Sequence, residues 1–225
     1  MAFHRGPKVS SSGLVFVIDG GDKNSYPGSG TNVLDMSGNN LSCVLVNGPT
    51  VDFQGITLDG VDDYAYVSHS GTLSFSTGDF TVCVWNKNIT AVTGLYGGII
   101  TNDNVGDNAW KFYKDFNKTC YTARSNTSIA DFPSFTAGRW HFYSFTFSSG
   151  TGQLYFDGVA GNSFSGASNP VSYSNLAFGS YRYGDAITGT YLRNQVIGPV
   201  HLYNRALSSA EILQNFNALR GRFGV

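Results

Sequence analysis

Hydrophobic and polar residues alternate along much of this chain, in short runs that turn residues separate. Residues 79–85, DFTVCVW, alternate strictly, which predicts a strand with one buried face and one face in water. Residues 13–19, GLVFVID, and 138–147, GRWHFYSFTF, are the other strong strand signals. About a dozen strands at this spacing are typical of an antiparallel sandwich, and no exact internal repeat is visible.

Two Asp-Gly pairs predict turns between strands. Residues 56–67, ITLDGVDDYAYV, predict two short strands around the first pair. Residues 153–159, QLYFDGV, predict a strand that runs into a hairpin at Asp157-Gly158.

One strong helix signal follows the last strand. Ser208 and Glu211 have the spacing of a capping box, in which each side chain bonds the backbone N–H of the other residue. An apolar face then continues to a stop signal at Gly221, so we expect one short amphipathic helix over residues 208–220. Glu211 is the only glutamate of the chain, and this interpretation gives it a structural role.

The composition agrees with one β-sandwich domain. Charged residues make up 13% and aromatic residues 15% of the 225 residues. The formal net charge of −1 gives no electrostatic reason to expect nucleic acid or an anionic membrane as a partner. No run suits a transmembrane helix, and residues 1–12 lack the apolar centre of a signal peptide. We therefore expect a soluble protein made in a cytoplasm, without membrane insertion.

We expect three parts along the chain: an N-terminal arm over residues 1–12, the sandwich over residues 13–220 and a short tail over residues 221–225. The cysteines are odd in number and widely spaced, which fits neither a disulfide framework nor a zinc site. They are predicted to be buried free thiols: Cys43, Cys83 and Cys120.

A succession of motifs carries a family resemblance from about residue 13 to residue 219. In chain order they read TLDGVDDYAYV, DFTVCVWNK, GRWHFYSFTF, QLYFDGV, LAFGSY and YNRALSSAEI. This order resembles the laminin-G-like branch of the concanavalin A-like lectin/glucanase family. The resemblance implies an all-β jelly-roll sandwich of two curved antiparallel sheets with one short C-terminal helix.

The flanking pieces resemble small laminin-G-like proteins encoded by tailed bacteriophages. They read GPKVSSSGLVFVIDGG, NSYPGSGT, NGPT and EILQNFNALRGRFGV. This narrower resemblance implies a multicopy structural protein on the virion surface, either a capsid decoration protein or a fibre component. Its partners are then other virion proteins, with host-surface glycans as a further candidate.

Catalysis by the glucanase branch depends on clustered glutamates, and hydrolysis needs two carboxyl groups facing each other across the bond. Glu211 stands alone in a cap. Asp62 and Asp63 point to opposite faces if their segment is extended, and Asp103 and Asp107 share a loop. We therefore predict a protein that is not an enzyme, with a glycoside hydrolase as the remote alternative. The histidines are scattered and predicted to be structural.

A structural calcium site is an open alternative, although no cofactor is required. Asp35 and Asp59 lie in turns rich in oxygen ligands, and both are equally suited to bonding their own backbone. Relatives in the family often hold calcium through an aspartate on the strand before the YNRALS motif. This chain has Gly198-Pro199 there.

Sugar binding needs an exposed aromatic platform flanked by polar groups that orient hydroxyls. The loops over residues 102–116 and 181–194 have this content, although aromatic residues that alternate along a β protein also suit core packing. The candidate residues are Trp110, Tyr181, Tyr183, Asp103, Asn108, Asp185 and Asn194.

Two function classes follow: a virion structural protein that displays a lectin-like domain, or a carbohydrate-binding module not tied to a virion. For the first class both chain ends are locally basic and carry aromatic residues, which predicts attachment to the particle. The attachment residues would be Phe3, Arg5, Lys8, Arg220, Arg222 and Phe223, with solvated tails as the alternative.

Overall fold

The computed structural model describes residues 7–68, 71, 73, 75, 78–89, 96–102, 110–115, 118–123, 130–131, 136–165, 175–180 and 192–225. They form two sheets, which we name sheet A and sheet B, and one helix. Sheet A contains β1 (Leu14–Ile18), β4 (Thr50–Asp52), β5 (Gly55–Asp59), β7 (Phe80–Asn88), β12 (Trp140–Ser148), β13 (Thr151–Phe156), β14 (Val159–Phe164) and β16 (Asn194–Tyr203). Sheet B contains β2 (Asn32–Leu34), β3 (Ser42–Val46), β6 (Tyr64–Ser68), β8 (Tyr96–Asn102), β9 (Trp110–Asp115), β10 (Lys118–Ala123), β11 (Ala130–Asp131) and β15 (Asn175–Phe178). The helix α1 spans Ser209–Phe223.

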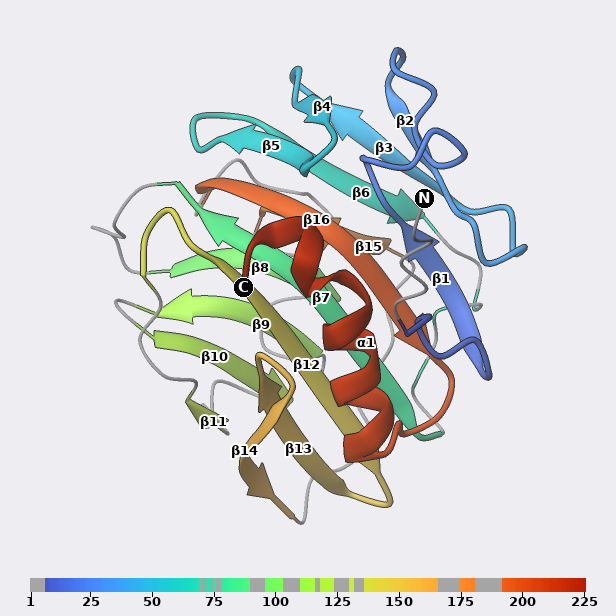
Figure 1. Ribbon diagram of the computed structural model, residues 1–225. Helices are drawn as coiled ribbons and strands as arrows, with labels where there is room; N and C mark the ends of the chain where they lie inside the picture. Colours follow the sequence, from blue (N-terminus) through green and yellow to red (C-terminus); the bar gives the residue numbers. More distant parts are fainter. Residues whose placement is uncertain are drawn as a thin grey trace.

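The two sheets pack as a sandwich, and α1 crosses the outer face of sheet A (Figure 1). Sheet A has the order β14-β13-β12-β7-β16-β5-β4, and β1 pairs with the C-terminal half of β16. Sheet B has the order β11-β10-β9-β8-β15-β6-β3-β2. Neighbouring strands run antiparallel throughout the described residues. The all-β sandwich with one C-terminal helix is therefore confirmed.

The main core lies between the sheets and collects alternate residues of their strands. On β7 these residues are Phe80, Val82 and Val84, all fully buried. Burial of this many large apolar side chains supplies most of the driving force for folding, at roughly 25 cal/mol per Å² of apolar surface removed from water.

A second apolar layer fills the space between sheet A and α1. The intervening residues of β7, among them Cys83 and Trp85, face away from the main core and are nevertheless fully buried. The Trp85 ring centroid lies 5.6 Å from that of Phe216 on α1. The prediction that residues 79–85 expose one face to water is wrong, because the helix covers that face.

The capping box at the start of α1 is confirmed. Ser208 Oγ accepts a hydrogen bond from the Glu211 N–H at 3.4 Å, and Glu211 Oε2 accepts one from the Ser208 N–H at 2.9 Å. The helix does not end before Gly221 as predicted, because it continues to Phe223 and ends at Gly224, which has a left-handed φ of 69°. Phe223 is buried against Trp85, and this packing outweighs the low helix propensity of Gly221.

The described part of the predicted N-terminal arm, residues 7–12, lies along α1. The Ser10 N–H donates to Asn215 Oδ1 at 2.7 Å, and Gln214 Nε2 donates to the Lys8 carbonyl oxygen at 2.6 Å. The Tyr203 hydroxyl, at the end of β16, donates to the Ser10 carbonyl oxygen at 3.0 Å. Residues 7–12 are therefore held against the domain, residues 1–6 lie outside the described residues, and the division of the chain into arm, sandwich and tail stays a prediction.

The hairpin at Asp157-Gly158 is confirmed. Both residues have positive φ, 49° and 81°, as a two-residue turn between β13 and β14 requires. The Asp157 carboxylate also accepts a hydrogen bond from the Phe142 N–H at 2.8 Å and contacts His141 Nδ1 at 3.0 Å. The turn is thereby tied to β12, and His141 has the structural role that the sequence predicts.

Cys43 and Cys83 are free thiols, as predicted, and both are fully buried. Cys43 lies in the core between the sheets, and Cys83 lies between sheet A and α1. Burial raises the pKa of Cys43, and it raises the pKa of Cys83 to about 12. The side chain of Cys120 lies outside the described residues. Within the described ranges, no helix has the length and apolar content needed to cross a membrane.

Candidate functional site

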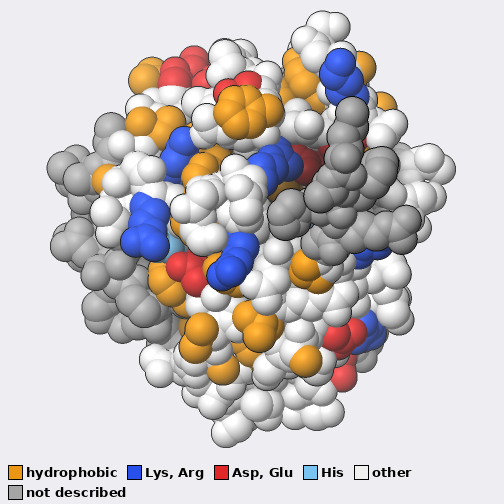
Figure 2. Space-filling view, viewed as in Figure 1, with side chains coloured by type: hydrophobic (Ala, Val, Ile, Leu, Met, Phe, Trp, Pro, Cys, Tyr) orange, Lys and Arg blue, Asp and Glu red, His pale blue; other side chains and the backbone are white. Residues whose placement is uncertain are grey.

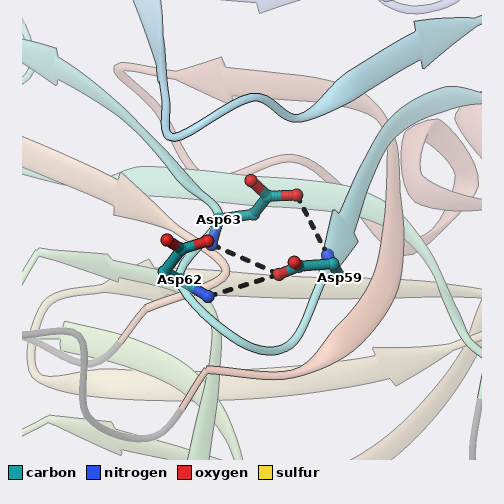
Figure 3. Close-up of side chains that lie close together, drawn as sticks. All are labelled: Asp59, Asp62 and Asp63. Atoms are coloured by element: carbon teal, nitrogen blue, oxygen red, sulfur yellow. Dashed lines mark hydrogen bonds between the residues drawn. The ribbon is translucent and has the colours of Figure 1, made fainter.

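A group of three carboxylates lies in the turn that carries the chain from β5 in sheet A to β6 in sheet B (Figure 3). We name Asp59, Asp62 and Asp63 the acidic turn. Asp59 Oδ1 accepts hydrogen bonds from the backbone N–H groups of Val61 at 2.8 Å, Asp62 at 3.3 Å and Asp63 at 3.4 Å. Asp63 Oδ2 accepts one from the Asp59 N–H at 3.2 Å. These bonds fix the positions of two of the three carboxylates.

Glycine at position 60 lets the acidic turn lie directly against the start of β16. Gly60 has a φ of 79°, and a Cβ atom added there would lie 2.5 Å from the Asn194 backbone nitrogen. Asn194 is paired with Asp59 in the strand register. Asn194, one of the predicted sugar contacts, is therefore brought next to the acidic turn.

The acidic turn concentrates negative charge. Ligand atoms of its carboxylates lie within 4.8 Å of one another, with Asp59 and Asp62 exposed and Asp63 buried. The backbone hydrogen bond from Val61 is the largest cause that lowers the pKa of Asp59. Burial is the largest cause that raises the pKa of Asp63, and the charges of Asp59 and Asp62 raise it further.

The sequence argument that Asp62 and Asp63 point apart depends on an extended backbone. The structure shows a tight turn before β6, and the two carboxylates converge. Sequence periodicity could not show this, because it assigns faces only within a regular strand. Three converging carboxylates suit a hard cation such as Ca²⁺, which takes six to eight oxygen ligands.

Of the two residues predicted for calcium, Asp59 belongs to this carboxylate group and Asp35 does not. Asp35 Oδ1 accepts hydrogen bonds from the Val17 N–H at 2.8 Å and the Ser37 N–H at 2.9 Å, and Oδ2 accepts one from Ser37 Oγ at 2.7 Å. Asp35 therefore behaves as a turn residue that also ties the turn to β1. Calcium binding itself stays a prediction for both residues.

Gly198 and Pro199 interrupt the pairing of β16 with β7. A Cβ atom at Gly198 would lie 2.8 Å from Trp85 Cβ and 3.0 Å from the nearest atom of the Trp140 ring. The glycine thus makes room for two tryptophans under α1. This explains in packing terms why an acidic residue does not fit here.

Trp110 is not an exposed sugar platform. Only 1% of its surface is exposed, and its ring packs in the main core with Phe80, at a centroid distance of 6.0 Å. The prediction is wrong because alternating aromatic residues of β9 point into the sandwich, which was the alternative reading of the pattern. The remaining predicted sugar contacts lie outside the described residues: Asp103, Asn108, Tyr181, Tyr183 and Asp185.

Sequence reasoning missed two aromatic residues beside the acidic turn. Tyr64 and Tyr66 are half-buried residues of β6, and their ring centroids are 6.4 Å apart. The intervening Ala65 and the following Val67 are fully buried in the main core. The signal was present in the Tyr-Ala-Tyr-Val alternation, which places both tyrosines on the outer face of sheet B.

The predicted attachment residues at the C-terminus are held within the domain. Arg222 forms an ion pair with Asp19, with Nη1 2.6 Å from Oδ2 and Nη2 2.9 Å from Oδ1. Phe223 is 8% exposed and packs between Trp85 and Trp140. Arg222 and Phe223 therefore make contacts within the domain, and their role in attachment stays a prediction.

Two further attachment residues, Lys8 and Arg220, are exposed. Phe3 and Arg5 lie outside the described residues. Figure 2 looks onto the α1 side, where blue Lys and Arg side chains are scattered among white and orange ones rather than gathered in one patch. The described part of this face therefore carries isolated positive charges and no continuous basic patch.

The sequence profile of a laminin G family, described as the concanavalin A-like lectin/glucanases superfamily, matches residues 59–213, which is more than half of the chain. The chain belongs to this superfamily. The matched segment begins at Asp59 in the acidic turn and ends within α1, so the superfamily pattern covers both the candidate site and the capped helix start. No curated protein sequence matches the chain.

Several solved structures share the fold of this chain and belong to much longer chains. Trypanosoma rangeli sialidase in complex with 2,3-difluorosialic acid matches with a TM-score of 0.71 and 20% identity, over 95% of this chain and 34% of the sialidase chain. The binding domain of botulinum neurotoxin DC in complex with SialylT matches with a TM-score of 0.70 and 16% identity, over 93% of this chain and 52% of the other.

A third structure concerns botulinum neurotoxin type C, whose cell entry depends on interaction with two ganglioside molecules. It matches with a TM-score of 0.72 and 16% identity, over 93% of this chain and 52% of the other. The chain therefore spans about a third to a half of these structures. At such identities the similarity shows the lectin-type fold alone.

Proposed function

We propose that this protein is a non-enzymatic, glycan-binding structural protein displayed on the surface of a bacteriophage virion. The observation that carries the glycan-binding part is membership of the concanavalin A-like lectin/glucanase superfamily together with a polar and aromatic surface beside the acidic turn. The solved structures of similar shape support it, because they include complexes with 2,3-difluorosialic acid and with SialylT, and a neurotoxin whose cell entry depends on two ganglioside molecules.

The arrangement of the acidic turn supports a role without catalysis. Glycoside hydrolysis places a sugar between two carboxyl groups that are about 5 to 9 Å apart. The carboxylates of the acidic turn converge on one another within a single turn, and Asp63 is 6% exposed. Asp59 and Asp63 are also occupied by backbone N–H groups, and Glu211 is part of the helix cap.

Display on a virion is supported by the resemblance of several chain segments to phage-encoded laminin-G-like proteins. The fold adds a geometric argument. Residues 7–12 lie along α1, so both ends of the described chain are on the outer side of sheet A (Figure 1). Attachment on this side leaves the outer face of sheet B, with Tyr64 and Tyr66, turned away from the particle. A low content of charged residues makes such a surface insensitive to ionic strength.

A second candidate is a carbohydrate-binding module that is not tied to a virion. The chain spans only about a third to a half of the solved structures it resembles, which is the relation expected of one module in a larger protein.

Two measurements test the proposal. Binding of the purified chain to an array of immobilised glycans tests the lectin-type function, and we expect reproducible binding to at least one glycan class. A mass-spectrometric inventory of purified particles tests display, and we expect the protein in many copies. Glycan binding by a protein absent from particles would favour the module, and particle incorporation without glycan binding would leave a purely structural protein.

A further inference from the structure

Tyr64 and Tyr66 form an aromatic pair on the outer face of sheet B. They lie two residues apart on β6, with ring centroids 6.4 Å apart and ring planes inclined by 36°. Neither hydroxyl makes a hydrogen bond with the part of the chain that the structure describes, and both side chains are partly exposed.

Three other described tyrosines have hydrogen-bond partners for their hydroxyl groups. The hydroxyls of Tyr26 and Tyr203 donate to backbone carbonyl oxygens at 3.2 and 3.0 Å, and that of Tyr155 contacts a serine hydroxyl at 3.1 Å. A tyrosine with its hydroxyl in water and its ring partly exposed contributes little to the core. Such residues are typical of binding surfaces, because the ring offers apolar contact and the hydroxyl offers hydrogen bonds.

The strand register places shorter side chains beside the tyrosine rings. Tyr66 is paired with Val44 on β3 and with Ala177 on β15, and Tyr64 is paired with Val46. These side chains are all shorter than tyrosine; Ala177 is fully buried, and both tyrosines stay partly exposed beside these neighbours. Two adjacent rings offer more area than one pyranose covers, which favours a ligand of at least two sugar units.

Polar groups lie at both ends of the aromatic pair. At one end the acidic turn directly precedes Tyr64, and the exposed Asp62 carboxylate accepts no hydrogen bond within the described ranges. At the other end Ser68 follows on the same strand, where its Oγ donates to Asn175 Oδ1 at 2.7 Å. Sugar hydroxyls that extend beyond the rings would thus meet hydrogen-bonding groups on either side.

Among the residues that the structure describes, the charge beside the tyrosine pair is negative. Asp59 and Asp62 are both exposed, with no ion pair recorded for either among the described residues. Arg193 passes Gly60 with its backbone, but it is 9% exposed and its side chain packs against Gly97. A carboxylated or sulfated sugar would therefore be repelled, whereas hydroxyl groups can donate to the carboxylates.

We propose that Tyr64, Tyr66 and Asp62 form the binding site for an uncharged glycan of two or more pyranose units. The sugar faces stack on the two rings, and their hydroxyls donate to Asp62. This inference rests on the proposed glycan-binding function and narrows its ligand class. It also distinguishes this chain from the similar structures that are in complex with 2,3-difluorosialic acid or SialylT.

The test uses the full chain and matched pairs of oligosaccharides that differ only in a terminal sialic acid. We expect the neutral member of at least one pair to bind about tenfold or more tightly than the sialylated member. Replacement of both tyrosines, Tyr64→Ala and Tyr66→Ala, should weaken neutral binding about tenfold or more, since stacking is lost. Phe53→Ala is the matched control, because Phe53 is 66% exposed at the β4–β5 turn of the other sheet, and it should bind as the wild type does.

A second variant does not depend on the tyrosines. Asp62→Lys changes an exposed side chain and should raise binding of the sialylated member about tenfold relative to the neutral one. Equal binding by wild type and the double tyrosine variant, or an unchanged preference in Asp62→Lys, would overturn the proposed site while leaving glycan binding intact. If the wild type binds neither member of any pair, the proposed function itself fails.

Discussion

Arg205 and Glu211 form a two-point ion pair at the start of α1, with Nη2 2.5 Å from Oε1 and Nη1 3.0 Å from Oε2. Ser10 joins the pair, because its Oγ accepts from Arg205 at 3.1 Å and donates to Glu211 at 3.2 Å. One carboxylate therefore connects the helix cap, the turn after β16 and the N-terminal residues. This makes the sole glutamate of the chain a junction of three segments.

The Glu211 junction predicts a loss of stability in acid. The hydrogen bond from Arg205 is the largest cause that lowers the pKa of Glu211 to about 2. A lowered pKa stabilises the folded state above the unfolded value, about 4.5, and this stabilisation is lost as the pH falls towards 2. We expect Glu211→Gln to lower the free energy of unfolding at pH 7 by on the order of 1–2 kcal/mol. The difference between the variant and the wild type should become smaller by pH 3. Urea unfolding of the wild type and the variant between pH 7 and pH 3 measures this difference. A difference that stays constant with pH would contradict the role of the Glu211 charge.

The burial of His201 predicts a second dependence of stability on pH. Its ring is buried with no hydrogen bond to Nδ1, and burial lowers its pKa to about 4 against the opposing effect of Asp19. The unfolded chain takes up the proton near pH 6.5, so stability is complete above that value and falls as the pH decreases towards 4. The loss should reach at most about 3 kcal/mol. His201→Leu should flatten the unfolding free energy between pH 7 and 4, and a slope equal to that of the wild type would rule this out.

The packing of Phe223 against two tryptophans predicts that the C-terminal residues stabilise the domain. Its ring centroid lies 4.6 Å from that of Trp85 and 4.3 Å from that of Trp140. Phe223→Ala should therefore lower the free energy of unfolding by about 3 kcal/mol. Leu213→Ala is the control on the same helix, because Leu213 is 45% exposed and its removal should cost less than about 0.5 kcal/mol. Similar thermal midpoints for the two variants would indicate that the aromatic contact does not support the fold.

The burial of the Asp63 carboxylate predicts that the protein becomes more stable when this charge is removed. Its pKa is raised, so the folded state is favoured below the unfolded value and loses this advantage as the pH rises through the folded value. Asp63→Asn keeps an oxygen for the Asp59 N–H and should raise the thermal midpoint at pH 7 in metal-free buffer. Asp52→Asn, at an exposed carboxylate in another turn, is the control for loss of one negative charge. A lowered midpoint in Asp63→Asn would show that the charged form is favourable.

The thermal midpoint of unfolding also tests the expectation that no cofactor is required. We expect chelation of divalent metals to leave the thermal midpoint of the wild type unchanged. A fall on chelation that calcium reverses, and that Asp63→Asn abolishes, would instead establish a structural calcium in the acidic turn.

Features set by neighbours in the sequence were predictable. The capping box depends on Ser208 and Glu211 alone, and the hairpin depends on the positive φ that Asp157 and Gly158 tolerate. Both are present as expected. The same is true of the alternation that directs Phe80, Val82 and Val84 into the core.

Features set by distant packing were not predictable. The outer face of β7 is buried only because α1, far along the chain, lies on it, and α1 passes Gly221 only because Phe223 meets Trp85. At the candidate site, the carboxylates converge because the chain changes sheets at Gly60, which no local period reveals. The tyrosine pair escaped notice because the alternation of β6 does not show which of its outward-facing side chains stay partly exposed.

The two buried thiols occupy separate packing layers, so the reaction rate of each thiol reports on the opening of its own layer. Cys43 lies between the sheets and Cys83 lies beneath α1, so neither reacts with an alkylating reagent until its own layer opens. In a Cys120→Ser background, the labelling rate at each remaining position reports how often that layer opens. Detachment of the helix alone would label Cys83 ahead of Cys43, whereas cooperative unfolding would label both at one rate.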